Sequence, residues 1–538
     1  MQNFIIRSKT FRFTPKELFM RNSKKLSAII LSAIMLATGC TDNTAPGEST
    51  EIKENSSVIT ENNGTGDSGN SEPDTKSVVN AVKDISVDTK VKILSWYSLN
   101  DNGIAKNYKE LFGVPENIPQ GYEESNSWDS GNDTESSPDE KPFAEIRVTS
   151  YADRYSDLAK LIQADDSPDA FPAQLYAMMY FNSNDKSDKY FDAVDGVIDF
   201  GLSELAPYNK IQNDIRMFDK NYCPIYNVSP SSVFWYRSSV IKNAGLEDPW
   251  ELYEKDEWTW NKFLEMCEKF SDGKQSTEDI VKYDGNIKFG IDGDNVPTNL
   301  LATTGIHLFG NDNGLYIDNS GTDKMKAAME FLRQFDTTQK SLRYPRDLLN
   351  NWAPNYREWA KGNTLFFEDG IWRYEEKWIE YKEKEKWSED EINFVPFPRY
   401  DAEKTYSQNM NATSFLLPKG SKNKAGYQSL IYTDIYARNN TEMQKASRQY
   451  DKTEYGWNDR LLDKAEKISQ PDAFNWVCDY SSIALFIIGS GCGEDVPGAL
   501  LNNTFLTGVK YDEVLEEYGS VNSREAEMLN TPPEKSTN

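Results

Sequence analysis

The chain has 538 residues and a formal net charge of −27 at pH 7, with 86 Asp and Glu residues against 59 Lys and Arg residues. This balance argues against a nucleic-acid-binding protein, because the phosphate backbone is bound mainly by Lys and Arg. Aromatic residues make up 13% of the chain, and the composition as a whole fits a soluble, exported protein.

The N-terminal region has the pattern of an export signal. A cationic stretch from Arg21 to Lys25 precedes an apolar run, Leu26–Leu36. A membrane span needs about twenty apolar residues, so this shorter run has the length expected of a secretory signal. We therefore predict a signal peptide over residues 1–39, with Met20 as the expected true start because it gives a signal of ordinary length.

Three small residues separate the apolar run from Cys40, and together they resemble the lipobox of bacterial lipoproteins. The resemblance implies that Cys40 carries a diacylglycerol and anchors the protein at the extracellular face of the cell membrane. The alternatives are an ordinary secretory signal with an incidental cysteine, or an internal apolar helix. Residues 40–80 hold few large apolar side chains, so we predict a disordered linker with a reach of about 35 Å.

The remaining residues of metal-binding or redox type predict neither a metal site nor a cofactor. Four cysteines follow Cys40 without zinc-ligand spacing, at positions 223, 267, 478 and 492. Cys478 and Cys492 are either a disulfide or two buried thiols. His307 is the single histidine and has no HExxH context, which favours a structural role.

Strand and helix patterns alternate in the first part of the folded region. Residues 89–98 and 142–151 have the apolar patterns of buried strands, and the acidic stretch between them, 119–141, is predicted to be a surface insertion. A helical stripe with spacings of four, three and four follows, at Tyr151, Tyr155, Leu158 and Ile162. This alternation predicts an α/β lobe with a mainly parallel sheet.

Later segments continue the same pattern. Two short strands are predicted at 222–226 and 232–236, and a helix from Trp260 has Thr259 as its predicted N-cap. Further predictions are a helix over 325–335, strands within 362–372 and 392–398, and a strand, turn and helix over 411–435. About 460 residues remain after the signal and linker, which suits two lobes better than one core.

Six segments, in order, resemble the family-one extracellular solute-binding proteins of ABC importers, the type that includes maltose-binding protein. They are VKILSWYS, SPDAF, the crossover segment YCPIYNV…SVFWYRSSVIKNAGLEDP, KGNTLFFEDGIW, INFVPFP and SFLLPKGSKNKAGYQSLIY, spanning about residues 89–437. The sequence departs from the family pattern in FWYR at the crossover and in GNTLFF before the acidic turn.

The resemblance implies an α/β, two-lobed periplasmic-binding-protein-like fold of type II, with the ligand cleft between the lobes. We assign residues 81–228 plus about 411–475 to lobe 1, and residues 229–410 plus about 476–538 to lobe 2. The chain would cross between lobes near 226–232 and 411–414, and closure would be a hinge motion. The expected partners are a carbohydrate, the permease subunits of an ABC transporter and the membrane, but no nucleic acid, and we expect a monomer.

Sugars present apolar C–H faces and hydroxyl groups, so their sites combine aromatic plates with amide and carboxylate partners. Trp96 and Tyr97 end the first strand, at the edge where α/β lobes open their clefts. Packing of Trp96 inside its lobe is the alternative. Asp169 and Asn411 are candidate hydroxyl partners, with a capping or turn role as the alternative for Asp169. At the crossover, at least one of three aromatic residues should face the cleft: Tyr226, Trp235 and Tyr236.

Trp372 follows the acidic turn EDGI and matches the place of the family's frequent sugar-stacking aromatic residue. The resemblance therefore implies that its indole stacks on the ligand, and an indole in the core under the helix start is the alternative. Glu368 and Asp369, just before it, are either ligand partners or charges at a helix N-terminus.

Two other functions stay open at this point. A lipid-anchored glycoside hydrolase would need two carboxylates at a fixed separation, and 86 acidic residues supply such pairs by chance. A sugar-binding sensor or adhesin would share the binding chemistry without transport. The GSGCG segment at 489–493 lacks the residues of a P-loop or a nucleophile elbow. We expect a binding protein rather than an enzyme.

Overall fold

The computed structural model of the chain describes residues 76–85, 91–96, 111, 123–125, 144–151, 153–175, 178, 190–271, 287–293, 295–335, 342–345, 355–480, 505 and 508–530. All of them belong to one compact unit, which spans 76–485 and 493–538. Cys40 with the predicted signal peptide, most of the predicted linker, and Tyr97 lie outside the described residues. Among the described helices, none has the length and apolar character that crossing a membrane would require.

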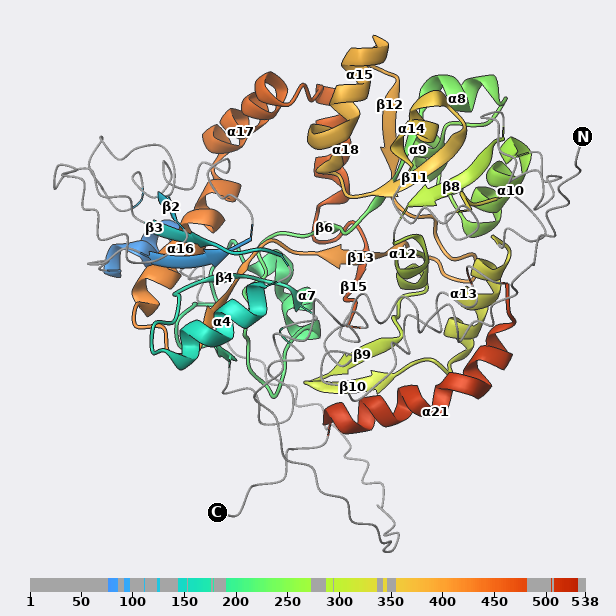
Figure 1. The fold of residues 1–538 in the computed structure, drawn as a ribbon. Helices are drawn as coiled ribbons and strands as arrows, with labels where there is room; N and C mark the ends of the chain where they lie inside the picture. Colours follow the sequence, from blue (N-terminus) through green and yellow to red (C-terminus); the bar gives the residue numbers. More distant parts are fainter. Residues whose placement is uncertain are drawn as a thin grey trace, which may run out of the picture. The chain divides into compact units, whose positions relative to one another are not determined.

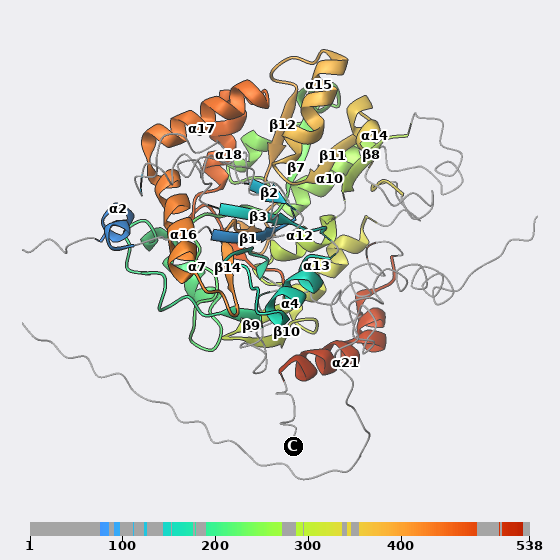
Figure 2. The same ribbon diagram turned by 60° about the vertical axis from the view of Figure 1, so that its left-hand side comes forward.

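The first of two hydrophobic cores lies around a parallel sheet in the order β1–β3–β2 (Figures 1 and 2). β1 (Val91–Ser95) pairs with β3 (Ala144–Val148), and β2 (Glu123–Ser125) pairs with the other edge of β3. The apolar side chains of β1 and β3 are buried, except that of Val148 at the end of β3, because both faces of a parallel sheet are normally covered. The two strands predicted at 89–98 and 142–151 are therefore confirmed.

We call the elements around this core the first lobe. Its longest helix, α16 (Lys424–Asn439), buries Tyr427, Leu430 and Ile431 and packs against β1 in both ribbon views (Figures 1 and 2). The core begins with Val78, which is 1% exposed. The other elements are α2 (Val78–Ala81), η1 (Val82–Asp84), α4 (Arg154–Gln163), β4 (Phe171–Pro172), β5 (Phe191–Asp192), η3 (Ala206–Tyr208), α7 (Asn209–Asp214) and β14 (Phe415–Pro418).

The second core lies around a mixed sheet in the order β12–β7–β11–β8. Its strands are β7 (Val233–Arg237), β8 (Phe289–Gly293), β11 (Thr364–Asp369) and β12 (Ile392–Val395). β11 runs parallel to β8, whereas β7 is antiparallel to both β11 and β12. The first lobe therefore has the predicted parallel sheet, β1–β3–β2, and also an antiparallel sheet in the order β4–β14–β5, while the second lobe has a mixed sheet.

We call the elements around this core the second lobe. The helix predicted from Trp260 is α10 (Trp260–Ser271), and Thr259 Oγ1 accepts the backbone N–H of Lys262 at 3.4 Å, as a cap does. The remaining elements are α8 (Ser238–Asn243), α9 (Pro249–Glu254), α12 (Val296–Ala302), the hairpin of β9 (Phe309–Asp312) and β10 (Leu315–Asp318), α13 (Asp323–Arg333), α14 (Tyr356–Lys361), the π-helical turn η4 (Tyr374–Trp378), α15 (Ile379–Glu385) and α21 (Tyr511–Asn530), which packs on β10 (Figure 1).

Two segments that run between the lobes pair side by side. β6 (Ser229–Pro230) is antiparallel to β13 (Ser407–Asn411), with Asn411 opposite Ser229. Next to them, the backbone N–H of Thr413 donates to Asn227 Oδ1 at 3.0 Å. The segments near 226–232 and 411–414, where the crossings are predicted, therefore lie side by side. β15 (Asn475–Val477) adds a parallel strand at the other edge of β13, which gives a crossing sheet in the order β15–β13–β6.

A third connection, which the sequence analysis did not predict, leaves the first lobe through α17 (Thr441–Glu454). This helix follows α16 and buries none of its residues. Arg448 binds Asp459 at the start of α18 (Asp459–Ile468). α18 then contacts the second lobe, where Lys467 binds Glu254 at 2.9 Å. Residues 459–468, which the sequence analysis placed in lobe 1, therefore pack against lobe 2.

Two smaller expectations were wrong. Residues 222–226 do not form a strand, because side chains satisfy their backbone: Gln212 Oε1 accepts the N–H of Ile225 at 2.8 Å, and the Ser414 hydroxyl donates to the Pro224 carbonyl at 2.6 Å. Tyr151 precedes α4 and is 58% exposed. The helical stripe therefore begins at Tyr155, and Tyr151 is free of the core.

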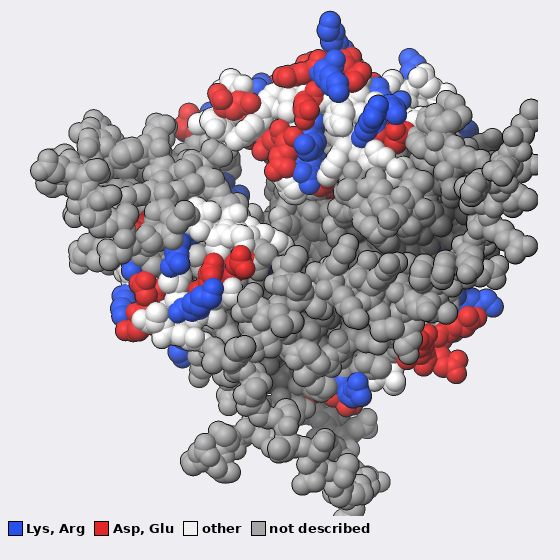
Figure 3. All heavy atoms as spheres, viewed as in Figure 1, with Lys and Arg blue, Asp and Glu red and all other residues white. Residues whose placement is uncertain are grey.

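The surface of the second lobe carries charges of both signs. In the upper part of Figure 3, over α15 and α18, Lys and Arg atoms lie beside Asp and Glu atoms. Several of these are ion pairs, such as Lys382 with Glu389 at 2.6 Å. Charges of both signs are therefore interspersed on the described part of this face.

Candidate functional site

Trp96 and Tyr151 lie together at one edge of the first lobe. Trp96 follows β1 and Tyr151 follows β3, and the carboxyl ends of parallel strands meet at the same edge of a sheet. Their ring centroids are 6.1 Å apart, in an edge-to-face arrangement. Trp96 is partly buried and packs 5.5 Å from the buried ring of Phe171. Trp96 therefore has a packing role, while part of its surface stays exposed.

Arg154, at the start of α4, holds these two rings in place. Its guanidinium carbon lies 3.7 Å from the ring centroid of Tyr151 and 5.4 Å from that of Trp96, within the range of cation–π attraction. Its Nε donates to Gln174 Oε1 at 3.0 Å, and its side chain is 6% exposed. The first lobe therefore presents a fixed aromatic edge, which we call the first half-site: Trp96, Tyr151 and Arg154.

A matching edge is found in the second lobe. β8 and β11 are parallel and end at Gly293 and Asp369, so the residues after these strands lie at one edge. Trp372 follows β11 and is 50% exposed, which is unusual for the largest apolar side chain. The alternative of an indole buried in the core is therefore wrong for Trp372.

The exposed indole of Trp372 is backed by a charged network. The guanidinium carbon of Arg373 lies 4.0 Å from the Trp372 ring, and Arg373 Nε donates to Asp369 Oδ2 at 2.8 Å. The Tyr356 hydroxyl donates to the same Asp369 oxygen at 3.0 Å. Burial alone would lower the pKa of Arg373, but the hydrogen bond and charge of Asp369 outweigh it and raise the pKa. We call Trp372, Arg373, Asp369 and Tyr356 the second half-site.

Each lobe is hydrogen-bonded to the segments that cross between the lobes. On the first lobe, the backbone N–H of Ala173, two residues after Phe171, donates to the Ser414 carbonyl at 2.8 Å. On the second lobe, Ser231 follows β6 and its hydroxyl donates to Asn299 Oδ1 at 2.6 Å. Asn411 itself is exposed at the end of β13. Its amide is therefore accessible at the crossing, as a hydroxyl partner would have to be.

Three aromatic residues predicted near the crossover are fully buried. Trp235 and Tyr236 are 0% exposed on β7, and Tyr226 is 1% exposed in the first core. Trp235 packs among Phe394, Tyr374 and Trp378. Because none of these rings offers a face to solvent, we leave them out of the candidate site and assign them to packing.

Asp169 has a structural position. It is 4% exposed and accepts the N–H of Lys92 at 2.9 Å and the Ser421 hydroxyl at 2.8 Å. Burial raises the pKa of this carboxyl despite the hydrogen bonds that it accepts. Lys92 lies at the start of β1 and Trp96 follows its end, about 13 Å away at the rise of a strand. Asp169 therefore links the turn before α16 to the start of β1, whereas Trp96 follows the other end of that strand. For this reason we leave Asp169 out of the half-sites.

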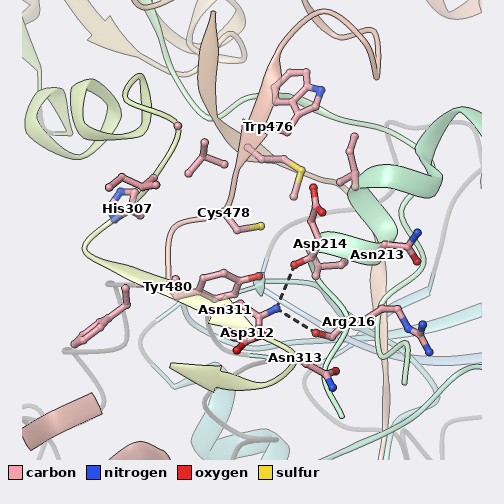
Figure 4. Close-up of a pocket in the computed structure, with 18 of the residues that line it drawn as sticks. Asn213, Asp214, Arg216, His307, Asn311, Asp312, Asn313, Trp476, Cys478 and Tyr480 are labelled. Carbon is pink, nitrogen blue, oxygen red and sulfur yellow. Dashed lines mark hydrogen bonds between the residues drawn. The ribbon is translucent and has the colours of Figure 1, made fainter. Parts of the chain in front are cut away.

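The structure also contains a pocket of about 820 Å³ between α7 and the β9–β10 hairpin (Figure 4). His307, Trp476, Cys478 and Tyr480 line it, and Asn311 Nδ2 donates to the carbonyl of Asp214 at 3.2 Å. The predicted site residues that the structure describes do not line this pocket. Met410 of β13 and three residues of β15, Asn475, Trp476 and Val477, also line it, and no residue of either half-site does.

The residues of metal-binding type have structural surroundings. His307 is 2% exposed, its Nδ1 lies 3.1 Å from Asp479 Oδ1, and no cluster of metal-ligand side chains occurs among the residues that the structure describes. Cys223, Cys267 and Cys478 are free thiols, and burial raises the pKa of Cys478 to about 12. Of the two alternatives for Cys478, a disulfide or a thiol, the structure has the thiol, and Cys492 itself lies outside the described residues.

Sequence reasoning missed Tyr151, Arg154, Tyr356 and Arg373. Tyr151 fits the apolar spacing of the following helix, and so the sequence analysis assigned it to the buried face of that helix. The signal that could have found it was its position just after the second strand, level with Trp96 after the first. Arg373 adjoins Trp372 in sequence, but the stacking of its guanidinium depends on the side-chain geometry after β11.

The profile of the bacterial extracellular solute-binding proteins matches residues 138–451, which is more than half of the chain. The chain belongs to this family. Its members are extracellular solute-binding proteins. No curated protein matches the chain at a significant level.

Solved structures of solute-binding proteins share the fold. The GacH receptor of Streptomyces glaucescens has a TM-score of 0.50 and 14% identity, over 82% of this chain and 99% of that one. The sugar transporter protein RHE_PF00321 of Rhizobium etli has a TM-score of 0.54 and 11% identity, over 81% of this chain and 99% of that one. The predicted two-lobed, type II α/β fold is therefore confirmed.

Proposed function

We propose that this solute-binding protein captures a carbohydrate between its two lobes and delivers it to the permease subunits of an ABC transporter. The observation that carries the carbohydrate proposal is the half-exposed indole of Trp372, which a partly buried network supports at a strand edge in a member of this family. Such a ring offers a flat apolar face on which the C–H face of a sugar can stack.

The chemistry of the two half-sites suits a sugar. The exposed faces of Trp372 and Tyr151 can each cover the apolar face of a pyranose ring. The accessible amide of Asn411 at the crossing can pair with hydroxyl groups. The GacH receptor was crystallised with acarbose, and the Rhizobium etli protein is described as a sugar transporter, which supports a carbohydrate ligand for this chain. An oligosaccharide would use both aromatic faces at once.

The paired crossing segments supply the means of closure. Two short strands, β6 and β13, pair at two positions, Met410 with Pro230 and Asn411 with Ser229. A rotation about so narrow a connection changes few backbone angles, which is what a hinge requires. Closure would bring the half-sites onto the sugar and exclude water from the aromatic faces.

The anchor and the partners complete the proposal. Lipidation at Cys40 would hold the protein at the extracellular face of the membrane as a monomer, and the linker of residues 40–80 would let it reach the permease. A sensor or adhesin role would use the same sugar site without a permease. Co-purification of permease subunits with the sugar-loaded protein would support import, whereas a signalling partner in their place would support sensing.

A thermal-shift screen against a panel of gluco-, xylo-, manno- and galacto-oligosaccharides of two to six units tests the proposal. A bound sugar stabilises the folded protein by mass action, so at least one member should raise the Tm. X-ray scattering with that sugar should show a smaller radius of gyration. No shift with any member would contradict the carbohydrate proposal, and turnover of a chromogenic glycoside would favour a hydrolase.

The location of the site is tested separately. Asn213 is exposed and lines the pocket of Figure 4, to which no half-site residue contributes. Asn213→Trp should therefore fill part of that pocket and leave the thermal shift unchanged. Loss of the shift in this variant, with the wild-type shift intact, would move the sugar site to the pocket.

A further inference from the structure

Glu368 lies at the centre of a buried hydrogen-bond network that joins the end of β11, close to the second half-site, to the crossing segment. It stands at the end of β11, four residues before Trp372, and is 2% exposed. Its Oε2 accepts the backbone N–H of Asn295 at 2.7 Å, and its Oε1 accepts Asn299 Nδ2 at 3.4 Å. Both carboxylate oxygens therefore face protein donors, not solvent.

Asn299 links Glu368 to the crossing segment through hydrogen bonds. It is 3% exposed, and its Nδ2 also donates to the Asn295 carbonyl at 2.9 Å. Its Oδ1 accepts the hydroxyl of Ser231 at 2.6 Å, and the backbone N–H of Ser231 donates to the Asn409 carbonyl on β13 at 2.8 Å. The amide is therefore fixed from both sides, and one network spans both crossing segments and two strand ends.

The backbone around Glu368 is shaped to fit it. Gly293, the last residue of β8, has a φ of +145°, and a Cβ at this position would lie 2.4 Å from Glu368 Cβ. No other residue type fits so close an approach at that backbone angle. The end of β8 is therefore pressed against Glu368, so that a shift of the carboxylate would also displace the residues after both strands.

We propose that Glu368 is a positioning residue, which through Asn299 and Ser231 couples the crossing segment to the placement of the second half-site. This inference rests on the proposed sugar site. A displacement of Ser231 at the crossing would shift Asn299 and Glu368. It would thereby move the ends of β8 and β11, and with them the turn that contains Trp372. Since coupling between two sites is reciprocal, sugar at Trp372 in turn favours one arrangement of the crossing.

Ser231→Ala tests the coupling, because it removes one hydroxyl at the crossing and touches no half-site residue. Ser229→Ala on the same segment is the matched control, since its hydroxyl is not part of the network. In the sugar-free protein, hydrogen exchange should become faster over residues 293–299 and 368–374 in Ser231→Ala and stay unchanged in Ser229→Ala. Unchanged exchange in both variants would overturn the network, whether or not any sugar binds.

Affinity provides the second readout, with the panel oligosaccharide that gives the largest thermal shift as the probe. Ser231→Ala should weaken its binding about two- to tenfold, the range expected for one hydrogen bond, with little change in the Tm of the sugar-free protein. Glu368→Gln should weaken binding further, and the double variant should lose less than the product of the two single losses. The coupling would be overturned if the affinity loss of the double variant equalled the product of the two single losses. It would also be overturned if Ser231→Ala and Ser229→Ala bound the sugar with equal affinity.

The two proposals fail in different ways. If wild-type protein binds no panel member, the proposed function fails while the exchange measurement still decides the network. If Glu368→Gln does not fold, the Ser231→Ala and Ser229→Ala pair decides the coupling alone. A Ser231→Ala variant that loses Tm but keeps full affinity would show a merely structural role and would overturn the proposal.

Discussion

The indole Nε1 of Trp235 donates a hydrogen bond to the carbonyl oxygen of Gly370, 3.2 Å away, and so a buried tryptophan fixes the turn that carries an exposed one. Trp235 is 0% exposed on β7, while Trp372, two residues after Gly370, is 50% exposed. The core thereby positions the surface ring. An aromatic residue that we expected to touch the ligand instead supports the residue that we propose to do so.

Gly370→Ala should reduce sugar affinity with little loss of stability. A Cβ at this position would lie 2.1 Å from Trp372 Nε1, so the indole has to move away from its present place. The ring is half exposed and can rotate without disturbing the core. Calorimetric titration and thermal unfolding would measure both effects. Unchanged affinity would show that the placement of Trp372 does not matter.

Trp235→Ala should behave in the opposite way and act mainly on stability. Removing a fully buried indole that packs against Phe394, Tyr374 and Trp378 leaves a cavity, which typically lowers the unfolding free energy by about 3–5 kcal/mol. Urea unfolding followed by circular dichroism would measure this. A variant of wild-type stability that has lost sugar binding would instead place Trp235 at the ligand.

Much of the fold could be predicted because its signals are local. The alternation in β1 and β3, the Thr259 cap of α10 and the strand–turn–helix ending in α16 are set by residues close together in sequence. The mixed sheet of the second lobe and the path of α17 to α18 depend on packing between distant segments, such as Lys467 with Glu254. Contacts of this kind cannot be predicted from the local periodicity of the sequence.

The site was less predictable than the fold, because the residue type does not determine exposure. Trp235, Tyr236 and Trp372 are equally suited to stacking on a sugar, but the first two lie inside the strand β7 and the third follows the end of β11. The position relative to a strand end separates them, and strand ends are the least certain part of a sequence-based prediction. Trp372 and Asn411 stay in the proposed site, whereas Tyr97 lies outside the described residues.

The stability of the second lobe should rise with pH in the alkaline range because of Lys464. Burial, and next the positive charge of Arg460, lower the pKa of Lys464 to about 8 from an ordinary value of 10.5. Its ammonium donates to Asn393 Oδ1 at 3.0 Å. Between these two pKa values the unfolded chain binds more protons than the folded one, so the unfolding free energy contributed by this group increases with pH.

Lys464→Met would isolate this effect from the other groups that titrate there. Urea unfolding of the wild type and the variant between about pH 8 and pH 10.5 should show the wild type gaining stability relative to the variant. Below this range Lys464 is charged in both the folded and the unfolded wild type. The difference in unfolding free energy between the wild type and the variant should therefore be constant there. A difference that is constant across the whole range would contradict the lowered pKa.

Cys40→Ser should release the protein from the membrane. If Cys40 carries the acyl chains, its replacement removes the anchor, and the protein should move to the soluble fraction or stay unprocessed. Partitioning between detergent and aqueous phases, with Cys478→Ser as the matched control, would measure this. Detergent-phase partitioning of Cys40→Ser equal to that of the wild type would contradict lipidation at this residue.

The account depends most directly on sugar binding at Trp372, which calorimetric titration of Trp372→Ala measures. If the indole removes about 60–100 Å² of apolar sugar surface from water, it contributes roughly 1.5–2.5 kcal/mol, or about a ten- to seventyfold change in Kd. We predict a loss of this size in a variant that folds like the wild type, with partial recovery in Trp372→Phe. Wild-type affinity in folded Trp372→Ala would contradict the account.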